Sequence, residues 1–95
     1  MPTVSESVTI INQRGLHARA SAKFVNMVAA LPEGLLAQVE KDGTTVTGTS
    51  IMGLKMLGAA KGSDVTVLVT GPDEAEAQRV LTKLAGLIKD GFGED

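Results

Sequence analysis

At the stretch GLHARASA, residues 15–22, the spacing of apolar residues changes from the alternation of a strand to the three- and four-residue spacing of a helix. Before it, apolar Val8 and Ile10 alternate with hydroxyl side chains, which predicts a strand over residues 5–11 and a polar turn over residues 12–15. After it, Phe24 and Val28 begin an apolar stripe with helical spacing, which predicts a helix over residues 17–31. Leu16 is the expected hydrophobic anchor between the two elements.

The rest of the chain continues with strand and helix patterns of similar length. Alternating residues predict strands at residues 35–41, 44–48 and 63–70, and Asp42-Gly43 is a hairpin signal between the first two. Two further helices are expected, one over residues 51–58 behind a Ser50 cap and one that starts near Pro72 and ends at Gly91. The prediction is an α+β open-faced sandwich, a four-stranded antiparallel sheet covered on one side by three helices in the order βαββαβα, as a single domain over residues 1–95.

Composition excludes several classes of function. Aromatic residues make up 2% of the 95 residues and the net charge is −2, so binding to nucleic acid is not expected. The chain has no cysteine, which excludes disulfides and thiolate chemistry. No apolar run is long enough to span a bilayer and no signal peptide is evident, so a cytoplasmic protein without membrane insertion is expected. The acidic residues Asp73, Glu74 and Glu76 are interpreted as part of a solvated first helical turn, and no metal site or cofactor is expected.

His17, the only histidine, is the strongest candidate for chemistry. It stands at the predicted start of a helix, where free backbone N–H groups and the helix dipole attract anions such as phosphate. Arg19 adds a permanent cation with a donor geometry suited to phosphate oxygens. These residues suggest transient phosphorylation of the imidazole. The alternative is a histidine that serves only as a helix cap or a surface residue, and local sequence leaves both interpretations open.

A family resemblance separates these alternatives. GLHAR at residues 15–19, SIMGL at residues 50–54 and Lys61-Gly62 resemble the HPr phosphocarriers of the bacterial phosphoenolpyruvate:sugar phosphotransferase system. The ending GFGED, residues 91–95, is similar to that of NPr, the nitrogen-related branch of the family. One departure is Ala20, which stands where the family usually has a proline; alanine still favours the helix.

The resemblance implies an HPr-like fold and a mechanism. His17 would accept a phosphoryl group on Nδ1 from Enzyme I, or from its nitrogen-type paralogue, and pass it to an EIIA-type protein. The backbone N–H groups of Ala18 and Arg19 and the Arg19 side chain would stabilise the phosphoryl group. Such a protein is a monomeric carrier with a phosphohistidine intermediate rather than a stand-alone enzyme, and it needs no cofactor.

The resemblance also assigns roles to the region around the second helix. In many family members the serine that matches Ser50 is phosphorylated for regulation by an HPr kinase/phosphorylase, although capping alone also explains a serine there. A short helix cannot bury every face, so part of its apolar surface is expected to dock partners, as the family uses it. The expected docking residues are Ile51, Met52, Lys55 and Met56. The alternative for the apolar members is a place in the core.

Two other functions compete with the carrier. One is a regulatory protein-binding module of the nitrogen-type system, which signals by its phosphorylation state and does not feed sugar transport. The other is a small-ligand-binding domain of the ACT kind, which the pair of His17 and Arg19 at a helix start disfavours. The sequence leaves the sugar-uptake and nitrogen-regulatory branches unseparated.

Overall fold

The computed structural model describes residues 1–94. Its strands and helices follow the predicted order, with a short 3-10 helix, η1, at the end. The elements are β1 (Thr3–Thr9), α1 (Ala18–Ala29), β2 (Leu36–Lys41), β3 (Thr44–Thr47), α2 (Ile51–Met56), β4 (Asp64–Thr70), α3 (Glu74–Lys89) and η1 (Gly91–Gly93). None of the helices in this part of the chain is both long and apolar enough to cross a membrane.

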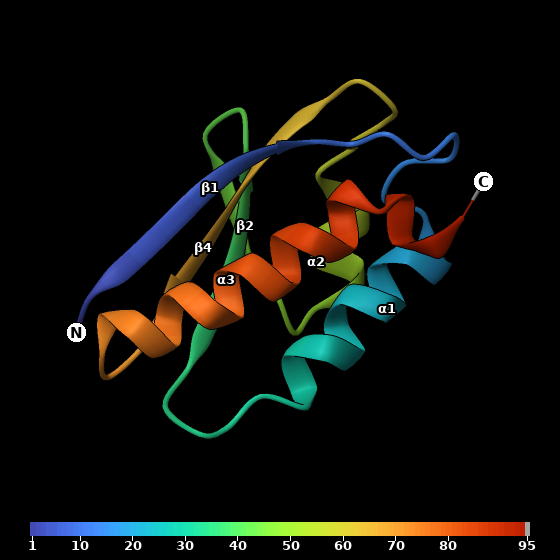
Figure 1. The fold of residues 1–95 in the computed structure, drawn as a ribbon. Coiled ribbons are helices and arrows are strands. Elements are labelled where there is room, and N and C mark those ends of the chain that lie inside the picture. The colour runs from blue at the N-terminus through green and yellow to red at the C-terminus, as the bar shows by residue number, and fades with distance from the viewer. Residues whose placement is uncertain (95) are drawn as a thin grey trace.

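The four strands form one antiparallel sheet in the order β1-β4-β2-β3. Val67 of β4 stands in register with Val39 of β2, and Val8 of β1 with Val65 of β4. These valines are buried under the helices, which all lie on one side of the sheet (Figure 1). The opposite face carries mainly hydroxyl side chains, as the alternation of each strand dictates. The predicted open-faced sandwich is confirmed.

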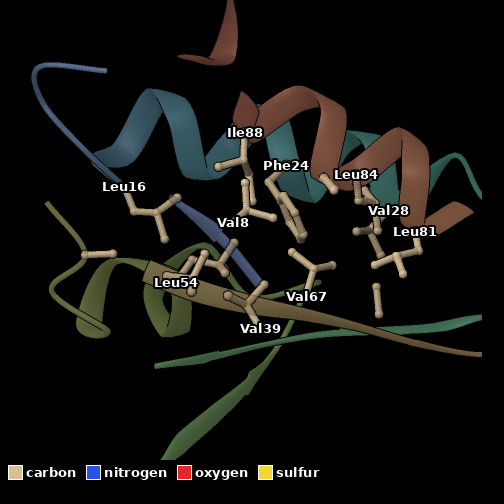
Figure 2. Close-up of a cluster of buried hydrophobic side chains, with 14 of the residues drawn as sticks. Val8, Leu16, Phe24, Val28, Val39, Leu54, Val67, Leu81, Leu84 and Ile88 are labelled. Atoms are coloured by element: carbon tan, nitrogen blue, oxygen red, sulfur yellow. The ribbon is translucent and has the colours of Figure 1, made fainter. Parts of the chain in front are cut away.

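The core lies between this sheet and the helices (Figure 2). Phe24 and Val28 project from α1, and an apolar stripe of α3 meets them. The buried members of that stripe are Ala77, Val80, Leu81, Leu84, Ala85 and Ile88. Aliphatic side chains therefore supply most of the buried surface, and both aromatic residues, Phe24 and Phe92, are buried with them.

Several predicted boundaries need correction; α1 ends at Ala29 and not at residue 31, and α2 ends at Met56 and not at residue 58. β1 begins at Thr3, two residues early, because Thr3 pairs with Thr70 and their hydroxyl oxygens lie 2.7 Å apart. α3 begins at Glu74, and the Asp73 carboxylate caps it by accepting the Glu76 N–H at 2.9 Å, so Pro72 lies before the helix. α1 begins at Ala18, with His17 as its N-cap.

The loop between β1 and α1 is fixed by the segment that follows α2. The Ile10 N–H donates to the Ser63 carbonyl at 2.8 Å, and the Leu16 N–H donates to the Ala59 carbonyl at 2.9 Å. Leu16 is only 5% exposed, which confirms its predicted role as an anchor. These contacts determine where α1 starts and in which direction its first turn points.

Gly15 permits the close approach of these two segments. Its φ is +62°, and a Cβ atom at this position would lie 2.3 Å from the Ala59 carbonyl oxygen. That oxygen belongs to the backbone, so the clash can be relieved only by moving the loop. Gly58 has nearly the same φ, +67°, but a Cβ atom there would meet no atom within 4 Å.

Replacing Gly15 or Gly58 by alanine is expected to lower the free energy of unfolding by different amounts. Gly58→Ala carries only the penalty of a positive φ, about 1 kcal/mol. Gly15→Ala adds the clash with Ala59 and is expected to lower the free energy of unfolding by about 3 kcal/mol or more. Urea denaturation of both variants measures the difference, and equal destabilisation would contradict the steric role of Gly15.

Candidate functional site

His17 forms the N-cap of α1 and holds its imidazole between two partners. Its backbone is extended, with φ −74° and ψ 179°, and Nδ1 accepts the Arg19 N–H at 3.2 Å. On the other side of the ring, Nε2 lies 2.7 Å from Oε2 of Glu94. The side chain is 13% exposed, so the ring is mostly enclosed but reachable.

The two partners define the tautomer of the imidazole. A backbone N–H can only donate, so Nδ1 must present a lone pair to Arg19. A carboxylate can only accept, so Nε2 must carry the proton that faces Glu94. Both contacts therefore assign the neutral Nε2–H tautomer to His17. The nitrogen with the free electron pair is the one at the positive end of α1.

Glu94 is held in place by two further contacts of the C-terminal segment. Its Oε1 accepts from Nδ2 of Asn12 at 3.0 Å, and the same Nδ2 donates to the Gly15 carbonyl at 2.9 Å. Two residues earlier, Phe92 is buried at 1% exposure, and its carbonyl accepts from Nζ of Lys23 at 2.6 Å. Figure 1 places the end of the described chain beside the first turn of α1.

The electrostatic setting keeps Glu94 ionised. Partial burial alone would raise the pKa of Glu94, but hydrogen bonds from Asn12 and His17, with attraction to His17 and Lys23, outweigh burial and lower the pKa below its ordinary value. Because the folded-state pKa is lowered, the stabilisation from this carboxylate is present above the ordinary glutamate pKa. It is lost as the pH falls through the lowered value.

The first turn of α1 is suited to an anion. The N–H groups of Ala18 and Ala20 have no partner within the helix because of their position in the first turn. Arg19 is exposed there, and it forms no ion pair within residues 1–94. α1 has no acidic residue in its first turn, whereas α3 has two. The dipole of a helix favours acidic residues in the first turn, so Arg19 in this place does not help the helix itself. Its presence favours a role of this turn in binding an anion.

The other predicted residues lie on α2. The Ser50 hydroxyl accepts the Gly53 N–H at 2.9 Å, so the predicted N-cap is confirmed. Leu54 is the buried residue of this helix, while Lys55 is exposed. The three apolar residues expected at the surface are 41%, 64% and 78% exposed, in the order Ile51, Met52 and Met56. α2 packs against α1, and Ala59 in the segment after α2 accepts the Leu16 N–H. The predicted phosphate site at the start of α1 and the predicted docking residues of α2 therefore lie on neighbouring elements.

Sequence reasoning missed Glu94, Asn12 and Lys23. From the sequence, Asn12 is part of a polar turn, Glu94 is part of a family-like ending, and Lys23 is given no role. Glu94 is 77 residues from His17 along the chain, and no local spacing relates positions so far apart. One available signal was Phe92, one of only two aromatic residues, since an aromatic side chain after the last helix can anchor the segment that carries Glu94.

Comparison with a protein-family model and with related proteins identifies the family of this chain. Residues 4–89 match the protein-family model described as "PTS HPr component phosphorylation site". HPr of Neisseria meningitidis serogroup A is 46% identical over 91 residues, which cover 96% of this chain and 97% of that protein. NPr of Escherichia coli K12 is 36% identical over 93 residues, with coverage of 98% and 99%.

Solved structures agree with the sequence comparisons. The crystal structure of HPr-C-His from Thermoanaerobacter tengcongensis superposes with a TM-score of 0.77 at 38% identity, covering 100% of this chain and 99% of that one. The family model, the relatives and the fold all lead to one conclusion, that this chain belongs to the HPr family of phosphotransferase-system phosphocarriers.

Proposed function

We propose that this chain carries a phosphoryl group on Nδ1 of His17. Membership of the HPr family makes it a phosphocarrier of the phosphotransferase system, which interacts with Enzyme I-type donors and EIIA-type acceptors. The observation that supports His17 as the acceptor is the direction of its Nδ1 lone pair, which faces the positive end of α1 while Glu94 binds Nε2. The competing regulatory protein-binding module is not favoured by these relatives.

The transfer step balances without any further reagent. The Nδ1 lone pair attacks phosphorus of a phosphohistidine on the donor, and the P–N bond of the donor breaks. The electron pair of that bond stays on the donor imidazole, which becomes neutral. His17 keeps its Nε2 proton and becomes a phosphoimidazolium, and the reverse sequence delivers the group to the acceptor. Positioning and charge stabilisation are sufficient for such a step.

The first turn of α1 supplies the groups that would meet the phosphoryl oxygens. The Arg19 N–H is already directed at Nδ1, and at 3.2 Å its bond to nitrogen is long enough to be exchanged for one to a phosphoryl oxygen. The Ala18 N–H and the exposed Arg19 guanidinium are the other donors. The binding must remain moderate, because a carrier that stabilised the phosphoryl group strongly would transfer it slowly.

Partners are proposed to dock on α2. We call the surface formed by Ile51, Met52, Lys55 and Met56 the α2 patch. Its apolar side chains are exposed although the same helix buries Leu54 completely, so the helix is anchored in the core while the patch stays open. Methionine side chains adapt to differently shaped partners, which suits a protein that must meet both a donor and an acceptor.

Ser50 is proposed as a regulatory phosphorylation site for an enzyme of the HPr kinase/phosphorylase type. It is half-buried at the N-terminus of α2, directly before the α2 patch. A phosphate there would suit the helix dipole, so the fold would tolerate it. It would also add negative charge beside the surface that meets phosphorylated partners, and it would weaken their docking.

We further propose that the chain works as a single domain, as a monomer, in the cytoplasm. Residues 1–94 bury a mainly aliphatic core from β1, β2, β4 and three helices, with Val46 of β3 packed against it, without help from a second copy. Relatives of both the HPr and the NPr kind are similar to it over nearly the whole chain. Whether this chain serves sugar uptake or nitrogen regulation would depend on which EIIA protein accepts its phosphoryl group.

The test of His17 is intact-mass measurement after incubation with phosphoenolpyruvate and Enzyme I. The wild-type chain is expected to gain one phosphoryl group that is lost in mild acid. His17→Asn keeps a residue that caps helices well but has no nucleophilic ring nitrogen, so it is expected to gain none. An acid-labile phosphoryl group on His17→Asn would overturn the assignment.

The test of the α2 patch compares two exposed apolar residues. Met52→Glu puts a charge into the patch and is expected to raise KM of Enzyme I for this chain roughly tenfold, equivalent to about 1.4 kcal/mol of binding. Leu36, 49% exposed at the start of β2, is the control, and Leu36→Glu is expected to leave KM unchanged. Equal effects of the two variants would exclude a specific docking role.

The test of Ser50 separates charge from capping. Ser50→Asp retains an N-cap and adds charge, and it is expected to slow phosphoryl transfer from Enzyme I roughly tenfold with little change in stability. Ser50→Ala removes the cap, costs about 1 kcal/mol of stability and leaves transfer unchanged. Ser7→Asp adds the same charge to an exposed position of β1 as a control. Transfer by Ser50→Asp at the wild-type rate would reject regulation by charge.

A further inference from the structure

We propose that Glu94 is a positioning residue for phosphoryl transfer, which holds the proton on Nε2 of His17 so that the Nδ1 lone pair faces the incoming phosphorus. The inference rests on the proposed function of His17. Glu94 lies beyond residues 4–89, so it falls outside the part of the chain that matches the family model. The match to the family model therefore gives no information on the contact between Glu94 and His17, which comes from the structure.

Two contacts on opposite sides of one ring specify a single tautomer. The carboxylate at 2.7 Å from Nε2 and the Arg19 N–H at 3.2 Å from Nδ1 are compatible only when Nε2 carries the proton. A histidine in water populates both neutral tautomers, and the one with a proton on Nδ1 cannot attack through that nitrogen. Glu94 is the stronger of the two partners, because it is charged and its bond is short.

The carboxylate acts from a fixed position and not from the end of a loose tail. Phe92 anchors the segment in the core, with its backbone at a φ of +59°, which a residue with a side chain adopts only under constraint. Lys23 binds the Phe92 carbonyl, and Asn12 binds the second oxygen of Glu94. Both carboxylate oxygens are thus occupied, one by Asn12 and one by His17, so the acceptor at Nε2 is preorganised.

The same contact favours the charge that transfer creates. Attack through Nδ1 makes the ring a phosphoimidazolium, whose positive charge is shared with the Nε2–H group. Glu94 lies against that group and on the side of the ring away from the phosphoryl group. It therefore stabilises the product ring without meeting the phosphoryl oxygens directly. The aspartate of a Ser-His-Asp triad assists its histidine in the same physical way, by fixing the tautomer and stabilising the imidazolium.

The decisive measurement uses the unphosphorylated protein. Because His17 is the only histidine, uniform labelling with ¹⁵N gives one imidazole spin system, whose ¹⁵N shifts report the tautomer. The wild-type chain at neutral pH is expected to show a single Nε2–H tautomer. Glu94→Ala is expected to show a mixture of both neutral tautomers and, in rapid-quench experiments with phosphorylated Enzyme I, transfer slower by roughly tenfold or more.

Two other variants separate the role of Glu94 from general effects on the tail. Asp90→Asn removes an exposed carboxylate four residues earlier, with no contact to His17, and is expected to change neither the tautomer nor the rate. Lys23→Gln loosens the anchor but leaves Glu94, and it is expected to give an intermediate tautomer mixture. The backbone NMR spectrum of each variant verifies that it is folded.

The outcomes distinguish this inference from the proposed function. If Glu94→Ala keeps a single Nε2–H tautomer, or if it shifts the tautomer without slowing transfer, Glu94 is not a positioning residue, and the phosphocarrier assignment stands. Slower transfer with an unchanged tautomer would mean that Glu94 acts in docking, and it would also overturn the inference. Phosphorylation of His17→Asn, by contrast, would refute the assignment of the acceptor and leave the tautomer result intact.

Discussion

The contact of the Gly15-Leu16 backbone with Ala59 and Ala60 is the constraint on which the site depends. It closes the loop after β1 onto the segment after α2, and it is possible only because Gly15 has no side chain. The contact fixes Leu16 in the core and therefore the start of α1. His17 obtains its extended backbone and its direction from this arrangement, so the geometry of one imidazole depends on packing between segments more than forty residues apart.

The site is assembled from three separate parts of the chain. The loop after β1 contributes Asn12, the start of α1 contributes His17, and the C-terminal segment contributes Glu94. Asn12 is 2% exposed, and its Oδ1 has no hydrogen-bond partner within residues 1–94, although its Nδ2 serves two acceptors. Asn12 therefore joins the loop after β1 to the carboxylate that faces His17.

α2 combines two requirements that usually conflict. A six-residue helix needs tertiary packing to exist, because isolated short helices are marginal in water. Leu54 provides that packing on one side, and Ser50 caps the first turn. The remaining apolar side chains are then free to stay at the surface. One face of this short helix packs in the core through Leu54, and the other face is exposed. The exposed face is therefore available for recognition without loss of the packing that stabilises the helix.

The sequence by itself determined the element order, the helix-facing valines of the sheet and the identity of His17 as the reactive candidate. These follow from local periodicity, from turn residues and from an anion-binding helix start, which are all encoded over a few neighbouring positions. Only the tertiary structure decided the tautomer of His17, because its partner Glu94 is distant in sequence and reaches the ring through a buried Phe92. Long-range contacts of single side chains leave no periodic signal in the sequence. The tautomer of His17 therefore follows only from the folded structure, in which the C-terminal segment lies against the start of α1.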